Sequence, residues 1–114
     1  YLQQRSIPIA ILTNKPRTVT DALLPRLEDG IQWSSIICPE DAGAPKPDPK
    51  GLQLILENLN CPVEEALLVG DSAVDFATGA AAGVRTIGRR DGYGVAAPPE
   101  PDLWVDELTE LIPN

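Results

Sequence analysis

Short runs of apolar residues alternate along the chain with longer segments in which apolar residues recur at helical spacing. An uninterrupted apolar run of this length is typical of a strand buried on both faces of a sheet. Such runs predict strands at residues 7–12 and 67–69. Less continuous apolar residues predict a strand or strand-like segment at 33–37 and another strand at 84–88.

The segments between the first strands carry helix signals. Pro16 is well placed as the first residue of a helix, and Pro25 is expected to kink or end that helix. Asp48 is expected to cap the next helix, which Pro49 would start and whose apolar residues recur at helical spacing. These residues are Leu52, Ile55, Leu56 and Leu59.

The second half of the chain predicts two more helices. Ser72 has the character of an N-cap and Gly83 that of a stop, and the helix between them is rich in small residues that permit close approach to the sheet. Asp102 is expected to cap a last helix. The apolar residues of that helix would be Leu103, Trp104, Leu108, Leu111 and Ile112. The remaining segments are expected to be an acidic loop at 38–41, a glycine-rich loop at 89–94 and an extended connector at 97–101.

This alternation predicts an α/β fold with a parallel sheet and helices on both faces. We expect a three-layer, Rossmann-like arrangement that forms a single domain over residues 1–114. The carboxyl ends of parallel strands lie along one rim of the sheet, where ligands bind. Side chains that follow different strands can therefore meet there although they are far apart in sequence.

Five polar residues at or just beyond strand ends are candidates for a site at this rim. Asp71 and Asp75 offer oxygen ligands for a divalent cation beside a helix N-terminus that favours an anion such as phosphate. Thr13 and Asn14 add a hydroxyl and an amide, and Lys46 adds an ammonium between two prolines. A hydroxyl, an ammonium and two carboxylates at one rim would suit a phosphate together with a cation.

Each candidate also has a purely structural interpretation. Thr13 and Asn14 could cap the helix that follows them, and Lys46 could be an ordinary surface lysine. Asp75 could complement a helix dipole, and Asp71 could tie down a loop. These alternatives stay open at the level of single residues, and only the joint pattern favours a binding site.

The composition removes several classes of function. The 114 residues carry a formal net charge of −8, which argues against nucleic acid or an anionic membrane as a partner. The chain contains no histidine, so Ser-His-Asp chemistry and histidine-ligated metals are excluded within it. Cys38 and Cys61 are the only cysteines and lack a metal-binding spacing, which favours a reduced, cytoplasmic location.

Three motifs resemble the second, third and fourth motifs of the haloacid dehalogenase-like phosphatases, in the same order. They are Ile-Leu-Thr-Asn at 11–14, Lys-Pro-Asp-Pro at 46–49 and Val-Gly-Asp-Ser-Ala-Val-Asp at 69–75. Residues 82–84 and 92–94 are similar to the phosphoglycolate phosphatase-like branch of that family. The resemblance implies Mg²⁺-dependent hydrolysis of a small, phosphoglycolate-like phosphomonoester through an aspartyl-phosphate.

The same resemblance implies a role for each candidate residue. Thr13 would donate a hydrogen bond to a phosphoryl oxygen, with Asn14 beside it. Lys46 would neutralise charge on the phosphoryl group and on the attacking residue. Asp71 would ligate Mg²⁺, and Asp75 would support the metal shell directly or through water.

The chain departs from the family in one respect, because no Asp-x-Asp precedes Thr13. In the family this first motif supplies the nucleophile and the general acid/base. Its strand lies between those that end at Thr13 and Asp71, so we expect these two strands either to leave a gap or to pair with each other. The resemblance also places the family's cap domain before the strand that ends at Thr13, so we expect this chain to lack it.

We therefore expect a longer natural polypeptide whose N-terminal segment carries the nucleophile and the cap. The present chain alone should be inactive. The alternative function is a non-catalytic, phosphatase-like domain that binds a phosphometabolite or a partner protein. A receiver-type signalling domain is less favoured, because we find no acidic acceptor for it at a strand end.

Overall fold

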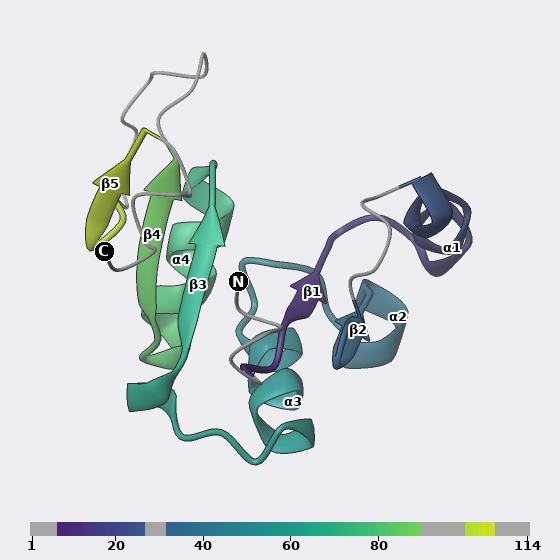
Figure 1. Ribbon diagram of the computed structural model, residues 1–114, viewed down its shortest axis with the longest axis horizontal. Helices are drawn as coiled ribbons and strands as arrows, with labels where there is room; N and C mark the ends of the chain where they lie inside the picture. The colour runs from purple at the N-terminus through teal and green to yellow at the C-terminus, as the bar shows by residue number, and fades with distance from the viewer. Residues whose placement is uncertain (1–6, 27–31, 90–99, 107–114) are drawn as a thin grey trace.

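The computed structural model describes residues 7–26, 32–89 and 100–106, which form short strands and helices in alternation (Figure 1). The elements in chain order are β1 (Ala10–Leu12), α1 (Arg17–Leu23), the 3₁₀ turn η2 (Leu24–Arg26), β2 (Ser35–Ile37), α2 (Pro39–Ala42), α3 (Lys50–Asn58), the 3₁₀ turn η3 (Val63–Glu65), β3 (Leu67–Gly70), α4 (Ala73–Ala82), β4 (Arg85–Arg89) and β5 (Leu103–Val105). The first strand is shorter than predicted, and the first helix gives way to a 3₁₀ turn next to Pro25, as predicted.

Every strand pair in the described residues is parallel, which confirms the predicted α/β class. The strands form two sheets, one with the order β1-β2 and one with the order β3-β4-β5. Figure 1 shows the second sheet on the left and the first toward the right, with α3 and α4 packed against them. In the described part of the chain β1 and β3 do not pair, so of the two predicted outcomes the gap is the one observed.

The prediction that Leu67–Val69 is buried on both faces is wrong. Leu67 is 60% exposed and Val69 is 43% exposed, whereas Leu68 between them is half-buried. Side chains alternate across a strand, and Leu68 lies on the side of α4, beside Gly79. Leu67 and Val69 therefore point away from α4, and the described residues bring no covering layer over them.

Helix α4 approaches the sheet as closely as its small residues predicted. A Cβ on Gly79 would collide with the Cγ2 methyl of Thr86 on β4 and would lie 3.2 Å from the carbonyl oxygen of Val84. The helix ends at Gly83, whose left-handed backbone (φ 75°) confirms the predicted stop. Contact at this distance is possible only because position 79 has no side chain.

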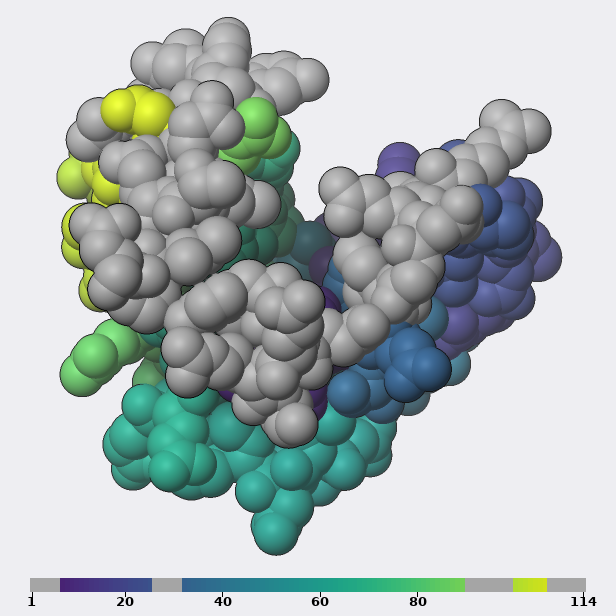
Figure 2. All heavy atoms as spheres, viewed as in Figure 1, coloured from purple at the N-terminus to yellow at the C-terminus, as the bar shows by residue number. Residues whose placement is uncertain are grey.

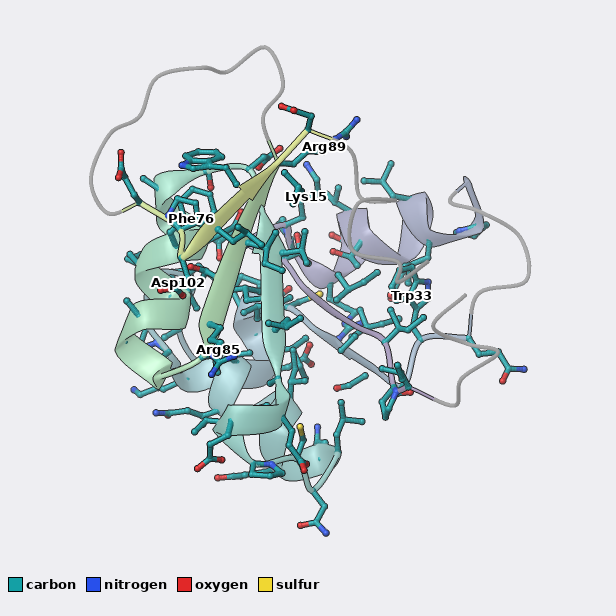
Figure 3. All side chains as sticks on the ribbon, turned by 60° about the vertical axis from the view of Figure 1, so that its left-hand side comes forward. Lys15, Trp33, Phe76, Arg85, Arg89 and Asp102 are labelled. Carbon is teal, nitrogen blue, oxygen red and sulfur yellow. The ribbon has the colours of Figure 1, made fainter. Side chains whose placement is uncertain are left out.

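The last predicted helix does not begin at Asp102, because Leu103–Val105 is strand β5. Asp102 docks this strand instead of capping a helix: its Oδ2 accepts the Thr86 N–H at 2.8 Å, and its own N–H donates to the Thr86 carbonyl at 3.0 Å. Trp104 then meets Phe76 of α4 edge-to-face, with ring centroids 5.6 Å apart, and Figure 3 shows Phe76 beside β5. The other predicted helix residues, Leu108, Leu111 and Ile112, lie outside the described residues.

The predicted acidic loop at 38–41 is also wrong, because Pro39–Ala42 is one turn of helix. Pro39 occupies its first position, and Asp41 Oδ2 accepts the Cys38 N–H at 2.8 Å, so the segment satisfies its own N-terminus. Most of the glycine-rich loop at 89–94 and most of the connector at 97–101 lie outside the described residues.

Arg17 connects α1 to the end of β2 and to α2. Its guanidinium donates to the Ile36 carbonyl at 2.9 Å and pairs with the Asp41 carboxylate, while its backbone N–H donates to Glu40 Oε2 at 2.9 Å. The Cys38 backbone N–H and the Arg17 guanidinium lower the pKa of Asp41. The same pairing with Asp41 raises the pKa of Arg17. Glu40 and Asp41, which the sequence assigned to an acidic loop, therefore join α1 to α2.

In the ranges that the structure describes, no helix is long and apolar enough to cross a membrane.

The close contact between Gly79 and Thr86 predicts that alanine at position 79 destabilises the fold, although alanine has the higher helix propensity. Propensity alone would favour Gly79→Ala by about 1 kcal/mol, but the added methyl collides with Thr86, and overpacking costs roughly 1–3 kcal/mol. We expect Gly79→Ala to lower the free energy of unfolding, as measured in urea. Thr86→Ser removes the opposing methyl and should restore part of the loss; a Gly79→Ala variant more stable than wild type would contradict the packing described here.

The lowered pKa of Asp41 makes a prediction about pH. A carboxyl whose pKa is lower in the folded than in the unfolded state adds stability above its unfolded pKa, and that stability is lost as the pH falls through the folded pKa. Asp41→Asn should therefore lower the free energy of unfolding by its largest amount above about pH 5. This difference from wild type should become smaller below about pH 4. Urea unfolding at several pH values measures it, with the exposed Glu64→Gln as control; a difference independent of pH would count against the pairing.

Candidate active site

The carboxyl ends of the strands in both sheets point toward one edge of the molecule. The arrowheads of β1, β3, β4 and β5 point upward in Figure 1. In Figure 3, Lys15 from the turn after β1 and Arg89 from the end of β4 both lie toward the upper edge. The rim expected from the sequence is therefore present, although the sheet is divided in two.

The turn after β1 presents Thr13 at this edge. The Thr13 backbone N–H donates to the Ile37 carbonyl at 3.1 Å, which ties the turn to β2. The Thr13 hydroxyl oxygen accepts the Lys15 backbone N–H at 3.1 Å, which leaves the hydroxyl proton to be donated elsewhere. The capping interpretation of Thr13 and Asn14 does not hold, because α1 has no side-chain cap and its first N–H, that of Arg17, goes to Glu40.

Asn14 and Lys46, 32 residues apart in sequence, are joined by two hydrogen bonds. The Lys46 backbone N–H donates to Asn14 Oδ1 at 2.7 Å, and Asn14 Nδ2 donates to the Lys46 carbonyl at 3.1 Å. The turn after β1 and the proline-rich loop before α3 are therefore held against each other.

The Lys46 side chain pairs with Asp75 on α4. The ammonium nitrogen lies 2.6 Å from Asp75 Oδ1, and the two side chains are only 14% and 13% exposed. This excludes the surface-lysine interpretation. Charges this far removed from water interact more strongly than surface pairs, and each would be costly to leave unpaired.

The corner between β3 and α4 is built around the Asp75 carboxylate. Ser72 is the N-cap residue of α4, as predicted, but its hydroxyl donates to Asp75 Oδ2 at 3.2 Å and makes no bond to the helix backbone. A Cβ on Gly70 would lie 2.5 Å from Asp75 Oδ2, so only glycine fits at the end of β3. Asp71 follows this glycine directly and is exposed at the corner.

The arrangement brings together four of the five predicted residues through direct bonds or chain adjacency. Thr13 and Asn14 share a turn, Asn14 bonds to Lys46, and Lys46 bonds to Asp75. Asp71 joins them only as the residue between Gly70 and Ser72, with its carboxylate open to solvent. A hydroxyl, an ammonium and carboxylates at a strand-to-helix corner can bind and neutralise an oxyanion.

The donors at this corner fit the chemistry of Mg²⁺. That ion keeps several waters and binds proteins through one or two carboxylates plus substrate phosphates. Asp71 is exposed and offers its carboxylate, whereas both Asp75 oxygens already accept bonds from Lys46 and Ser72. Across residues 7–26, 32–89 and 100–106, no cluster of three or more His, Cys, Asp or Glu side chains could hold a metal by itself.

Two contributors to the site were missed by reasoning from the sequence. The sequence predicts only a capping role for Ser72 and singles out no role for Gly70, although both lie against Asp75. The signal for both was their position within three to five residues of Asp75, on the turn that the helix start creates. A close approach of this kind depends on how the helix docks, which local sequence does not specify.

Comparisons with known proteins agree with this geometry. Residues 1–83 match the haloacid dehalogenase-like hydrolase family. Over 98% of its length the chain is 36% identical to phosphoglycolate phosphatase from Pectobacterium atrosepticum, and it covers 49% of that protein.

Two solved structures share the fold. A putative haloacid dehalogenase-like hydrolase from Bacteroides fragilis superimposes with a TM-score of 0.81 at 36% identity, over 97% of this chain and 54% of that one. A HAD phosphatase from Thermococcus onnurineus gives a TM-score of 0.83 at 27% identity, over 96% and 51%. The chain thus spans about half the length of these relatives. The matched family, the shared fold and the bonded motif residues together show that this chain belongs to the haloacid dehalogenase-like hydrolases.

Proposed function

We propose that the full-length protein carrying this sequence hydrolyses a small phosphomonoester with Mg²⁺, and that the substrate resembles phosphoglycolate. The observation that carries the proposal is the 2.6 Å pair between Lys46 and Asp75, which holds an ammonium beside the Asn14 turn at the carboxyl ends of the strands. The relative from Pectobacterium atrosepticum, named a phosphoglycolate phosphatase, supports the choice of substrate class.

Each residue has a role in this proposal. The Thr13 hydroxyl, with its proton available, donates to a phosphoryl oxygen. The Lys46 ammonium neutralises charge on the phosphoryl group, and its partner Asp75 keeps it in place before substrate arrives. The exposed Asp71 carboxylate would ligate Mg²⁺, and Asp75, whose oxygens already accept bonds from Lys46 and Ser72, would support the metal shell through water. When bound, the ion would supply further neutralisation of phosphate charge.

The nucleophile belongs to a part of the protein outside the three motifs, since no Asp-x-Asp precedes Thr13. Its carboxylate attacks phosphorus, the alcohol leaves as it gains a proton, and water then hydrolyses the aspartyl-phosphate.

We propose that the strand carrying this nucleophile fills the space between β1 and β3. In the described residues β1 pairs only with β2 and β3 pairs only with β4, so each has an edge without a strand partner. Figure 2 shows the surface hollowed between the green and yellow part of the molecule and the blue and purple part. The exposed Leu67 and Val69 on β3 add apolar surface beside this edge.

The second candidate function is a phosphatase-like domain that binds a phosphometabolite or a partner protein without catalysis. The absence of an Asp-x-Asp in this sequence before Thr13 favours it over an enzyme complete within these 114 residues. The two candidates differ in whether turnover appears once a segment carrying the nucleophile is present. A cytoplasmic location stays a prediction for either one.

The first test is turnover of p-nitrophenyl phosphate with Mg²⁺. We expect no turnover by the 114-residue chain and measurable turnover by an N-terminally extended form that carries an Asp-x-Asp strand, because the attacking carboxylate is then supplied. Asp71→Asn in the extended form should abolish the dependence on Mg²⁺ together with activity. Two results together would contradict the enzyme proposal: no turnover by the extended form, and no change in its affinity for phosphate when Asp71→Asn is introduced.

The second test concerns the charge of Lys46. In the extended form, Lys46→Met should lower kcat by about 10²–10³-fold, the loss typical of removing one group that stabilises transition-state charge. Lys50→Met, at the exposed start of α3, is the matched control and should change kcat by less than about twofold. Circular dichroism should verify that both variants fold, since Lys46→Met leaves Asp75 without its partner. Equal effects at positions 46 and 50 would remove Lys46 from the mechanism.

A further inference from the structure

The contact of Asn14 with Lys46 differs from an ordinary side-chain hydrogen bond. The Asn14 amide bonds to both the N–H and the C=O of one residue, at 2.7 and 3.1 Å. Because two bonds to a single residue fix its orientation as well as its distance, this contact determines which way the Lys46 backbone faces. Two bonds of this kind resemble the exchange between paired residues on neighbouring strands.

Asparagine is the side chain suited to this position. Its carboxamide places an acceptor and a donor side by side, whereas a carboxylate of the same shape only accepts and would face the Lys46 carbonyl with a negative oxygen. Asn14 has no local structural task that accounts for it, because α1 begins without a side-chain cap and the Thr13 hydroxyl accepts the N–H of the turn.

Lys46 is held at both of its ends by elements distant in sequence. Asn14 fixes its main chain from the turn after β1, and Asp75 fixes its ammonium from α4 at 2.6 Å. The flexible four-carbon stem between these ends has little freedom left, although lysine is otherwise among the most mobile side chains. A lysine ammonium acts as a point charge, so its use in neutralising phosphate depends on where it is held.

We propose that Asn14 is a positioning residue for Lys46: it acts on the phosphate through the placement of the lysine and not as a phosphate ligand. The proposal rests on the proposed function insofar as Lys46 serves phosphate. It leaves the direct contact with a phosphoryl oxygen to Thr13 alone in the turn after β1.

The first experiment measures backbone amide hydrogen exchange at Lys46 by NMR in the full-length protein. Asn14→Ala removes the acceptor of this N–H, so exchange at Lys46 should become about tenfold faster. Asn58→Ala, at an exposed asparagine on α3, is the matched control and should leave exchange at Lys46 unchanged. Unchanged exchange in a folded Asn14→Ala variant would overturn the proposal.

The second experiment is a double-mutant cycle with Asn14→Ala and Lys46→Met, read as the affinity for inorganic phosphate by calorimetry and as kcat/KM. If Asn14 acts only through Lys46, the double variant should match Lys46→Met within about twofold in both quantities. Fully additive losses would mean that Asn14 binds phosphate directly, and would overturn the proposal.

The two experiments separate failure of this inference from failure of the proposed function. A wild-type protein without turnover would refute the enzymatic function, yet hydrogen exchange and phosphate affinity would still decide the role of Asn14. A wild-type protein with turnover but with additive losses would refute the role of Asn14 and leave the enzymatic function standing.

Discussion

The ion pair between Lys46 and Asp75 is the contact on which the site depends. It joins the loop before α3 to the first turn of α4, and both side chains are largely removed from water. A buried pair of this kind contributes little net stability, because desolvation offsets much of the attraction. In the proposed function the pair serves to place the ammonium, because an ammonium that is already oriented and largely removed from water needs little reorganisation when a phosphate binds.

Close approaches at two glycine positions accompany this pair. Gly70 leaves room for the Asp75 carboxylate at the end of β3, and Gly79 lets α4 lie against β4 at Thr86. Gly70 lies just before α4 and Gly79 in its second half, so both contacts constrain how α4 sits on the sheet, and the first lies directly at Asp75. The way in which α4 docks on the sheet therefore affects both the packing of the helix and the position of the Asp75 carboxylate at the corner between β3 and α4.

The division into two sheets follows from which strands have partners. Strand β4 has neighbours on both sides, and Thr86, Ile87 and Gly88 in its middle are buried. Strand β3 has one neighbour in the described residues, and Leu67 and Val69 are exposed although their sequence is as apolar as that of a core strand. Burial of an apolar run is therefore a property of its neighbours, and a prediction made from the run alone fails at an open edge.

The sequence by itself determined the parallel α/β class, the start of α4 at Ser72 and its end at Gly83, and the candidate residues at the strand ends. These features depend on local spacing, on capping residues and on glycine conformation, which short stretches of sequence encode. Only the tertiary structure decided that Asn14 bonds to the Lys46 backbone and that the Ser72 hydroxyl donates to Asp75. It also decided that residues 39–42 are helical and that 103–105 form a strand. The bonds of Asn14 and Asp102 depend on partners distant in sequence, and the bond of Ser72 depends on how α4 docks. The turn at 39–42 caps itself, but it is held in place by Arg17 of α1. A local pattern has no information about such partners, so the residues could be named from the sequence while their bonds could not.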